Sequence, residues 1–93
     1  MTYSTEQKDL ISALIGTKIA PRTKSPSLRQ SLIEANEGMY KDTLTASDLI
    51  LINSALELLV APTPVDSSKE EYREIIEALM VTRGMLAERE TAL

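Results

Sequence analysis

The most apolar part of the chain is the stretch from Leu49 to Val60, in which nine of the twelve residues are apolar. At ~100° per residue the three polar residues fill a narrow wedge of a helix, into which Ile50 also points. The apolar side chains cover the remaining arc, which consists of Leu49, Leu51, Ile52, Ala55, Leu56, Leu58, Leu59 and Val60. The pattern predicts a buried central helix with neighbours on at least two sides.

Two amphipathic helices are expected before this segment. The first starts after Ser4, whose hydroxyl can form a capping box with Gln7, weakens at Gly16 and stops at Pro21. Its apolar face consists of Leu10, Ile11, Leu14 and Ile15. The second starts at Ser25-Pro26 and ends near Tyr40. Its apolar face is Leu28, Leu32, Ala35 and Met39, opposite Gln30, Glu34, Glu37 and Lys41.

Capping signals also delimit the central helix and a fourth, longest helix. Thr45 and Asp48 have the spacing of a capping pair, and the central helix must end before Pro62. Ser67 or Ser68 caps the fourth helix, which is expected to continue to about Glu90. Its inner stripe is predicted to be Tyr72, Ile75, Ile76, Leu79, Leu86 and Ala87.

Short connections between successive helices favour an all-α, antiparallel four-helix bundle with up-down-up-down order and packing angles near ~20°. The 93 residues are expected to form one domain, residues 1–93. Phe, Trp and Cys are absent, so we expect an aliphatic core without disulfides, which fits a reducing cytoplasm. Neither an apolar signal segment nor a run of ~20 apolar residues is recognisable, so neither export nor a membrane span is expected.

The residue types exclude most catalytic chemistry. The chain has no His and no Cys, hence neither the usual general base nor a thiol nucleophile, and its three glycines are isolated. We expect no enzyme activity, no cofactor and no metal. The acidic cluster Glu70, Glu71, Glu74 and Glu77 is more typical of a solvated helix face, with Arg73 forming local pairs, than of a cation site.

Charge gives one candidate surface. The net charge of -4 argues against a nucleic-acid partner. No acidic residue lies between Asp9 and Glu34, however, and this stretch contains Lys18, Arg22, Lys24 and Arg29. This basic corner is either a solubilising loop or a contact for anionic lipid headgroups or an acidic protein surface.

Single residues give further candidates. Val81 and Met85 fall away from the inner stripe, either as an exposed patch for a protein contact, as scattered surface residues, or under the N-terminal segment. Arg83 falls within the stripe, where it can reach water, pair with Glu57 or Glu90, or anchor an acidic partner. Ile50 is either a lone exposed aliphatic residue or part of a homodimer contact, so both monomer and homodimer remain open.

Three segments resemble the immunity proteins that protect lactic-acid bacteria and streptococci from pediocin-like bacteriocins. They are residues 25–35 (SPSLRQSLIEA), 49–53 (LILIN) and 70–76 (EEYREII), and the chain length is similar. The resemblance implies a cytosolic four-helix bundle that recognises a bacteriocin-engaged sugar permease at the inner membrane face. It also implies that the C-terminal half discriminates between toxins, here through Val81, Arg83, Met85 and Arg89.

The leading functional hypothesis is therefore a non-enzymatic, cytoplasmic immunity-type protein that binds a protein at the membrane face. The alternative is a small acidic regulator or inhibitor, of phage origin, that binds a soluble protein. In this alternative the regulator itself would form a homodimer through the Ile50 side of its central helix.

Overall fold

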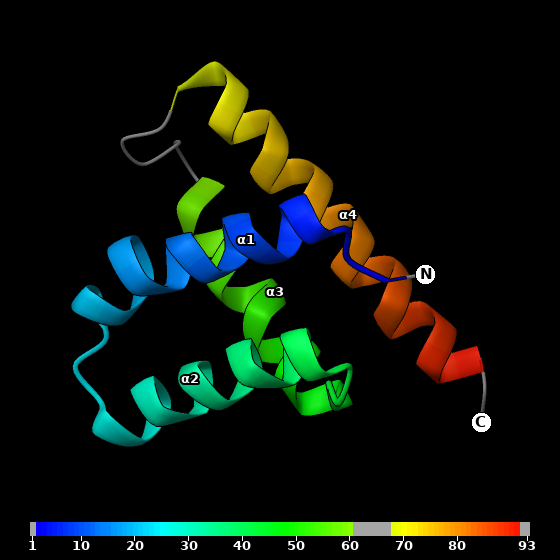
Figure 1. Cartoon of the computed structure of the whole chain (residues 1–93), viewed down its shortest axis with the longest axis horizontal. Helices are drawn as coiled ribbons and strands as arrows, with labels where there is room; N and C mark the ends of the chain where they lie inside the picture. The colour runs from blue at the N-terminus through cyan, green and yellow to red at the C-terminus, as the bar shows by residue number, and fades with distance from the viewer. Residues whose placement is uncertain (1, 61–67, 92–93) are drawn as a thin grey trace.

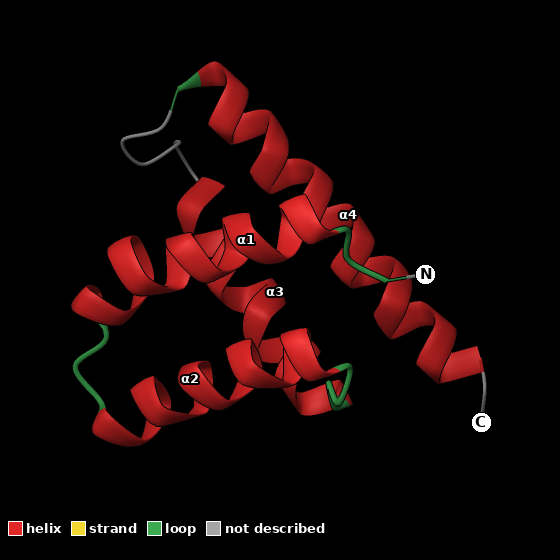
Figure 2. Cartoon of the chain, in the orientation of Figure 1, coloured by secondary structure: helices red, strands yellow, loops and turns green. Residues whose placement is uncertain are grey.

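The computed structural model describes residues 2–60 and 68–91, in which all regular structure is helical (Figure 2). The four α-helices are α1 (Thr5–Leu14), α2 (Pro26–Lys41), α3 (Ala46–Val60) and α4 (Lys69–Thr91). Two short helical turns, η1 (Ile15–Ile19) and η2 (Ala20–Arg22), extend α1. The predicted all-α four-helix bundle is confirmed.

Helix α3 lies behind α1 and packs against both α2 and α4 (Figure 1), which confirms neighbours on two sides. Helices α1 and α2 run in opposite directions, and the long α4 crosses beside them (Figure 1). Between α2 and α3, however, the chain direction turns by 113°. The expected packing angle near ~20° is therefore wrong for this pair.

The tight corner between α2 and α3 explains this wide angle. Asp42 adopts the left-handed conformation with a φ of 55°, and the Thr43 N–H donates to the Gly38 carbonyl at 2.9 Å. Helix α3 begins directly afterwards with the predicted reciprocal cap. The Asp48 N–H donates to Thr45 Oγ1 at 3.1 Å, and the Thr45 N–H donates to Asp48 Oδ2 at 3.0 Å. Fixed caps on both sides of so short a connection set the direction in which α3 leaves.

The other predicted helix starts are also confirmed. Ser4 and Gln7 form the capping box, with bonds of 2.9 and 3.1 Å. Ser25, the residue before Pro26, accepts a hydrogen bond from the Leu28 N–H at 3.3 Å. Ser68 accepts from the Glu71 N–H at 3.1 Å, whereas the other candidate cap, Ser67, lies outside the described residues.

The regular α-helix ends at Leu14, close to the weakening predicted at Gly16, and helical structure continues one residue beyond the stop predicted at Pro21. Its winding continues through a π-helical turn, η1, and a 3₁₀ turn, η2, so that helical structure ends at Arg22. Pro21 is the second residue of η2. An N–H group at this position would have no acceptor within the turn, so proline, which lacks the N–H, fits there. The chain leaves the helix at Thr23, whose hydroxyl donates to the Ile19 carbonyl at 2.8 Å.

Apart from Tyr3, the buried apolar core is aliphatic, as predicted, but α3 buries only one face. Ile50 is 57% exposed and Leu58 is 73% exposed, while Leu51 and Val60 are half-buried. The placement of Leu58 in the buried arc was thus wrong, because α2 and α4 cover the opposite side of the helix. The largest fully buried side chains are Ile11, Leu32, Met39, Leu49, Ile52, Leu56, Ile75 and Thr82.

Two other apolar faces also differ from the prediction. Leu28 is exposed because it lies in the first turn of α2, a full turn before the first buried residue, Leu32. On α4, Ile75 and Leu79 are buried as expected and Ala87 is exposed, contrary to expectation. The buried face of α4 is rotated toward Ala78, Thr82 and Met85, because Tyr3 of the N-terminal segment packs against Thr82.

Candidate interaction surfaces

The described residues contain no group of three or more acidic side chains placed to hold a metal ion. In the predicted acidic cluster, Glu71 forms an ion pair with Lys18 at 2.6 Å, and Glu70, Glu74 and Glu77 are exposed. Among the same residues, no single helix is both long and apolar enough to cross a membrane. Only α2 and α3 together, bent by 113°, reach that length and composition.

The basic corner divides into two kinds of cation. Lys18 contacts Glu71 of α4, and Arg29 Nη2 donates to the Thr23 carbonyl at 2.7 Å, which fastens the loop between η2 and α2. Arg22 and Lys24 are exposed and have no ion-pair partner in the described part of the chain. Two of the four predicted cations therefore stabilise the fold, and two are available to another molecule.

An apolar hollow adjoins this corner. It has a volume of about 130 Å³ and is lined by Lys18, Ile19, Arg22, Thr23, Ala55, Leu58 and Leu59. Exposed Leu58 of α3 thus lies on the same small depression as Arg22 of η2. The corner offers a partner both positive charge and an aliphatic contact.

The predicted patch of Val81 and Met85 is wrong. Met85 is buried and Val81 is half-buried against the core. The hydroxyl of Tyr3 lies 2.5 Å from Thr82 Oγ1, between these two positions, and both side chains are buried. The alternative of a helix covered by the N-terminal segment is the one that the structure shows.

The two arginines expected near the toxin-recognising end have internal partners. Arg83 Nη2 donates to Glu57 Oε1 at 2.7 Å, which confirms the predicted pairing, but its side chain is 59% exposed. Arg83 thus lies at the edge of the buried face, not in its middle. Asn53 also donates to Glu57 at 3.0 Å, and these bonds, led by that of Arg83, hold the pKa of Glu57 below its ordinary value. Arg89 donates to the Leu44 carbonyl at the α2–α3 corner.

Ile50 is not a lone exposed aliphatic residue. Leu58, eight positions later, is also exposed, and Ser54 lies between them. Residues separated by multiples of four positions share a stripe along a helix. We call Ile50, Ser54 and Leu58 the α3 stripe.

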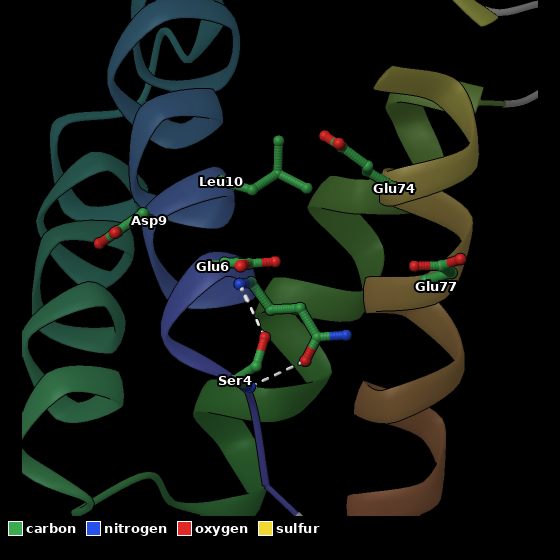
Figure 3. Close-up of a pocket in the computed structure, with 7 residues that line it drawn as sticks. Ser4, Glu6, Asp9, Leu10, Glu74 and Glu77 are labelled. Carbon is green, nitrogen blue, oxygen red and sulfur yellow. Dashed lines mark hydrogen bonds between the residues drawn. The ribbon is translucent and has the colours of Figure 1, made fainter. Parts of the chain in front are cut away.

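A second hollow lies between α1 and α4 (Figure 3). Its volume is about 590 Å³, and its lining residues are Ser4, Glu6, Gln7, Asp9, Leu10, Glu74 and Glu77. Leu10 projects between the two helices, Glu74 and Glu77 come from the facing helix, and Asp9 points to the other side of α1 (Figure 3). Asp9 accepts from the Tyr40 hydroxyl at 2.7 Å, which raises the pKa of Tyr40.

This hollow continues into another of about 400 Å³, lined by Gln7, Glu77, Met80 and Val81. The two share Gln7 and Glu77, and together we call them the α1–α4 groove. Met80 is 66% exposed in it. The sequence signals for the groove were an apolar Met80 on the acidic side of α4 and Val81 outside the inner stripe.

Comparison with protein-family models, curated proteins and solved structures gives no significant match. The resemblance to bacteriocin immunity proteins therefore stays a prediction.

Proposed function

We propose that this chain is a non-enzymatic immunity-type protein, which protects a bacterial cell from a pediocin-like bacteriocin by binding a protein at the cytoplasmic face of the membrane. The observation that carries the proposal is the basic corner, where exposed Arg22 lines the same hollow as exposed Leu58 and exposed Lys24 follows two residues later in the chain. Such a surface suits an acidic protein near a membrane, because cations steer the encounter and an apolar contact adds affinity.

The four residues that the resemblance implies, all in α4, support this role less well than the basic corner does. Val81 and Met85 are packed against the core, and Arg83 and Arg89 are engaged with Glu57 and Leu44. We therefore assign the partner contact to the corner formed by η2 and the exposed side of α3, and assign a structural role to the C-terminal candidates.

The test is expression of the chain in a bacteriocin-sensitive strain that is then challenged with a panel of pediocin-like bacteriocins. Selective protection against one or a few of them is expected. If cells expressing the folded protein remain sensitive to every bacteriocin, the proposal is wrong.

Charge reversal then tests the corner itself. The double variant Arg22→Glu/Lys24→Glu should lower the protective effect about tenfold, since two rim charges are reversed. The matched control is Lys41→Glu/Lys69→Glu, which makes the same change in net charge at two exposed lysines outside the corner. Equal protection by both doubles would remove the basic corner as the contact.

The α3 stripe favours a second candidate, the small acidic regulator that binds a soluble protein or a second copy of itself. Two large aliphatic side chains exposed on one side of a helix suit a helix-to-helix contact. Affinity capture from a host lysate discriminates, because a soluble partner retained without toxin or permease supports this candidate. Sedimentation of Ile50→Ser/Leu58→Ser beside the unmodified protein tests the dimer.

A further inference from the structure

The α1–α4 groove combines an apolar floor with an acidic rim. Its floor is formed by half-buried Leu10 and Val81 and by Met80, which is 66% exposed. Glu6 of α1 and Glu74 and Glu77 of α4 line its walls (Figure 3). A floor of leucine, valine and methionine would lose contact with water only if another molecule covered it.

Within residues 2–60 and 68–91, no cation neutralises the rim carboxylates. The described ion pairs join Lys8 with Asp42, Lys18 with Glu71, and Arg83 with Glu57. None of the described lysines and arginines pairs with Glu6, Glu74 or Glu77. The rim is therefore an uncompensated negative surface on a chain whose net charge is already -4.

The length of the groove sets the size of its occupant. From Glu74 to Val81 the floor and rim follow α4 for about two helical turns, or ~10 Å. The described chain has no strand whose edge an extended peptide could join. A partner helix, in contrast, can place apolar side chains on the floor and basic side chains on the rim.

We propose that the α1–α4 groove binds a cationic amphipathic helix, in which lysine or arginine flanks an apolar stripe of at least two turns. Charge complementarity selects this occupant, because three carboxylates border an aliphatic floor. The inference goes beyond the proposed function, since it concerns none of the residues of the basic corner.

The probe is a peptide of about 14 leucine and lysine residues, with leucine at the spacing of one helix face. Its control has the same composition in strict alternation, which disrupts the helical stripe. We expect calorimetric titration to show one-to-one binding of the helical peptide, weakened when salt rises from about 50 to about 300 mM.

Matched variants locate the contact. Glu74→Gln/Glu77→Gln should weaken binding about three- to tenfold, and Met80→Ser about threefold or more, because they change the rim and the floor respectively. Glu34→Gln/Glu37→Gln makes the same charge change on exposed positions of α2 and should alter binding less than about twofold. All of these residues are exposed, and thermal unfolding followed by circular dichroism verifies that each variant is folded.

Four results would overturn the proposal. The first is no binding of the helical peptide at about 1 mM, and the second is equal binding of the alternating peptide. The third is that both glutamine double variants weaken peptide binding equally. The attraction would then come from the net charge of the protein and not from the rim of the groove. The fourth is self-association of the protein that Glu74→Gln/Glu77→Gln abolishes. It would show that a second copy of the chain, and not a cationic helix, occupies the groove. None of these results bears on protection against bacteriocins.

Discussion

Tyr3 and Thr82, 79 residues apart in the sequence, form a buried hydrogen bond in which Tyr3 is the donor. Thr82 has one hydroxyl proton, which it donates to the Ala78 carbonyl at 2.7 Å within α4. In the 2.5 Å contact between the two hydroxyls, Tyr3 must therefore donate and Thr82 must accept. The bond fastens the segment before α1 to the middle of α4, three residues before the buried Met85.

The loss of stability should depend on which partner of this hydrogen bond is removed. Thr82→Val leaves the buried Tyr3 hydroxyl without its acceptor and should lower the free energy of unfolding by about 1–3 kcal/mol. Tyr3→Phe leaves Thr82 bonded to Ala78, so the cost should be smaller, about 0.5–1.5 kcal/mol. Urea unfolding of both variants measures the difference. A larger loss in Tyr3→Phe would contradict the assigned direction of the bond.

Burial raises the pKa of Tyr3 above its ordinary value of 10.0. The neutral form is favoured in the folded state, so this contribution to stability is complete below pH 10 and is lost as the pH rises through the raised pKa. Unmodified protein should therefore lose stability above pH 10 more steeply than Tyr3→Phe. The measurement is the difference between their unfolding free energies as a function of pH, which cancels the titration shared by both proteins.

The pKa of Glu57 is lowered, so its effect has the opposite sign. Arg83 and Asn53 stabilise the ionised carboxylate, and this contribution is present above the ordinary carboxylate pKa and lost as the pH falls through the lowered one. NMR titration of the Glu57 side-chain carbon should give a pKa below the ordinary value. Arg83→Met should raise it, whereas Arg29→Met, whose guanidinium bonds a carbonyl, should not.

The capping signals predicted where helices begin because they act locally. Ser4, Thr45 and Ser68 bond backbone N–H groups three residues away, so the sequence contains both partners of each bond. The aliphatic composition likewise predicted the all-α class. Periodicity could not show which side of α3 would be covered, since almost its whole circumference is apolar and the uncovered position of Leu58 depends on how α2 and α4 pack.

The candidate sites were harder to predict because they depend on contacts between distant segments. The sequence indicated the basic corner, but not that Glu71 of α4 would engage Lys18. It placed Met85 on the surface, since nothing in the pattern of α4 reveals that Tyr3 covers its neighbour Thr82. The α1–α4 groove joins Glu6 with Glu74 and Glu77, and only the folded chain brings these residues together.

Gly38 can be replaced by alanine with a gain in stability. It is buried near the end of α2, and an added Cβ would lie 3.5 Å from Thr43 Oγ1 and 3.6 Å from Asp48 Oδ2, which are ordinary contacts. Gly38→Ala should raise the unfolding free energy by about 0.5–1 kcal/mol, because alanine loses less backbone entropy in a helix. Gly38→Val should destabilise, since its methyl groups would crowd the corner. Thermal unfolding of both variants tests this pair of signs.

Leu56 and Leu58 are neighbours in α3 with opposite environments, 0% and 73% exposed respectively. Leu56→Ala removes packed atoms from the core and should cost about 2–5 kcal/mol. Leu58→Ala, with the same chemical change, should stay within about 0.5 kcal/mol, because nothing in the described chain covers the side chain. Urea unfolding at low protein concentration provides the comparison. Similar large losses in both variants would mean that α3 is enclosed on all sides and that the exposed α3 stripe does not exist in solution.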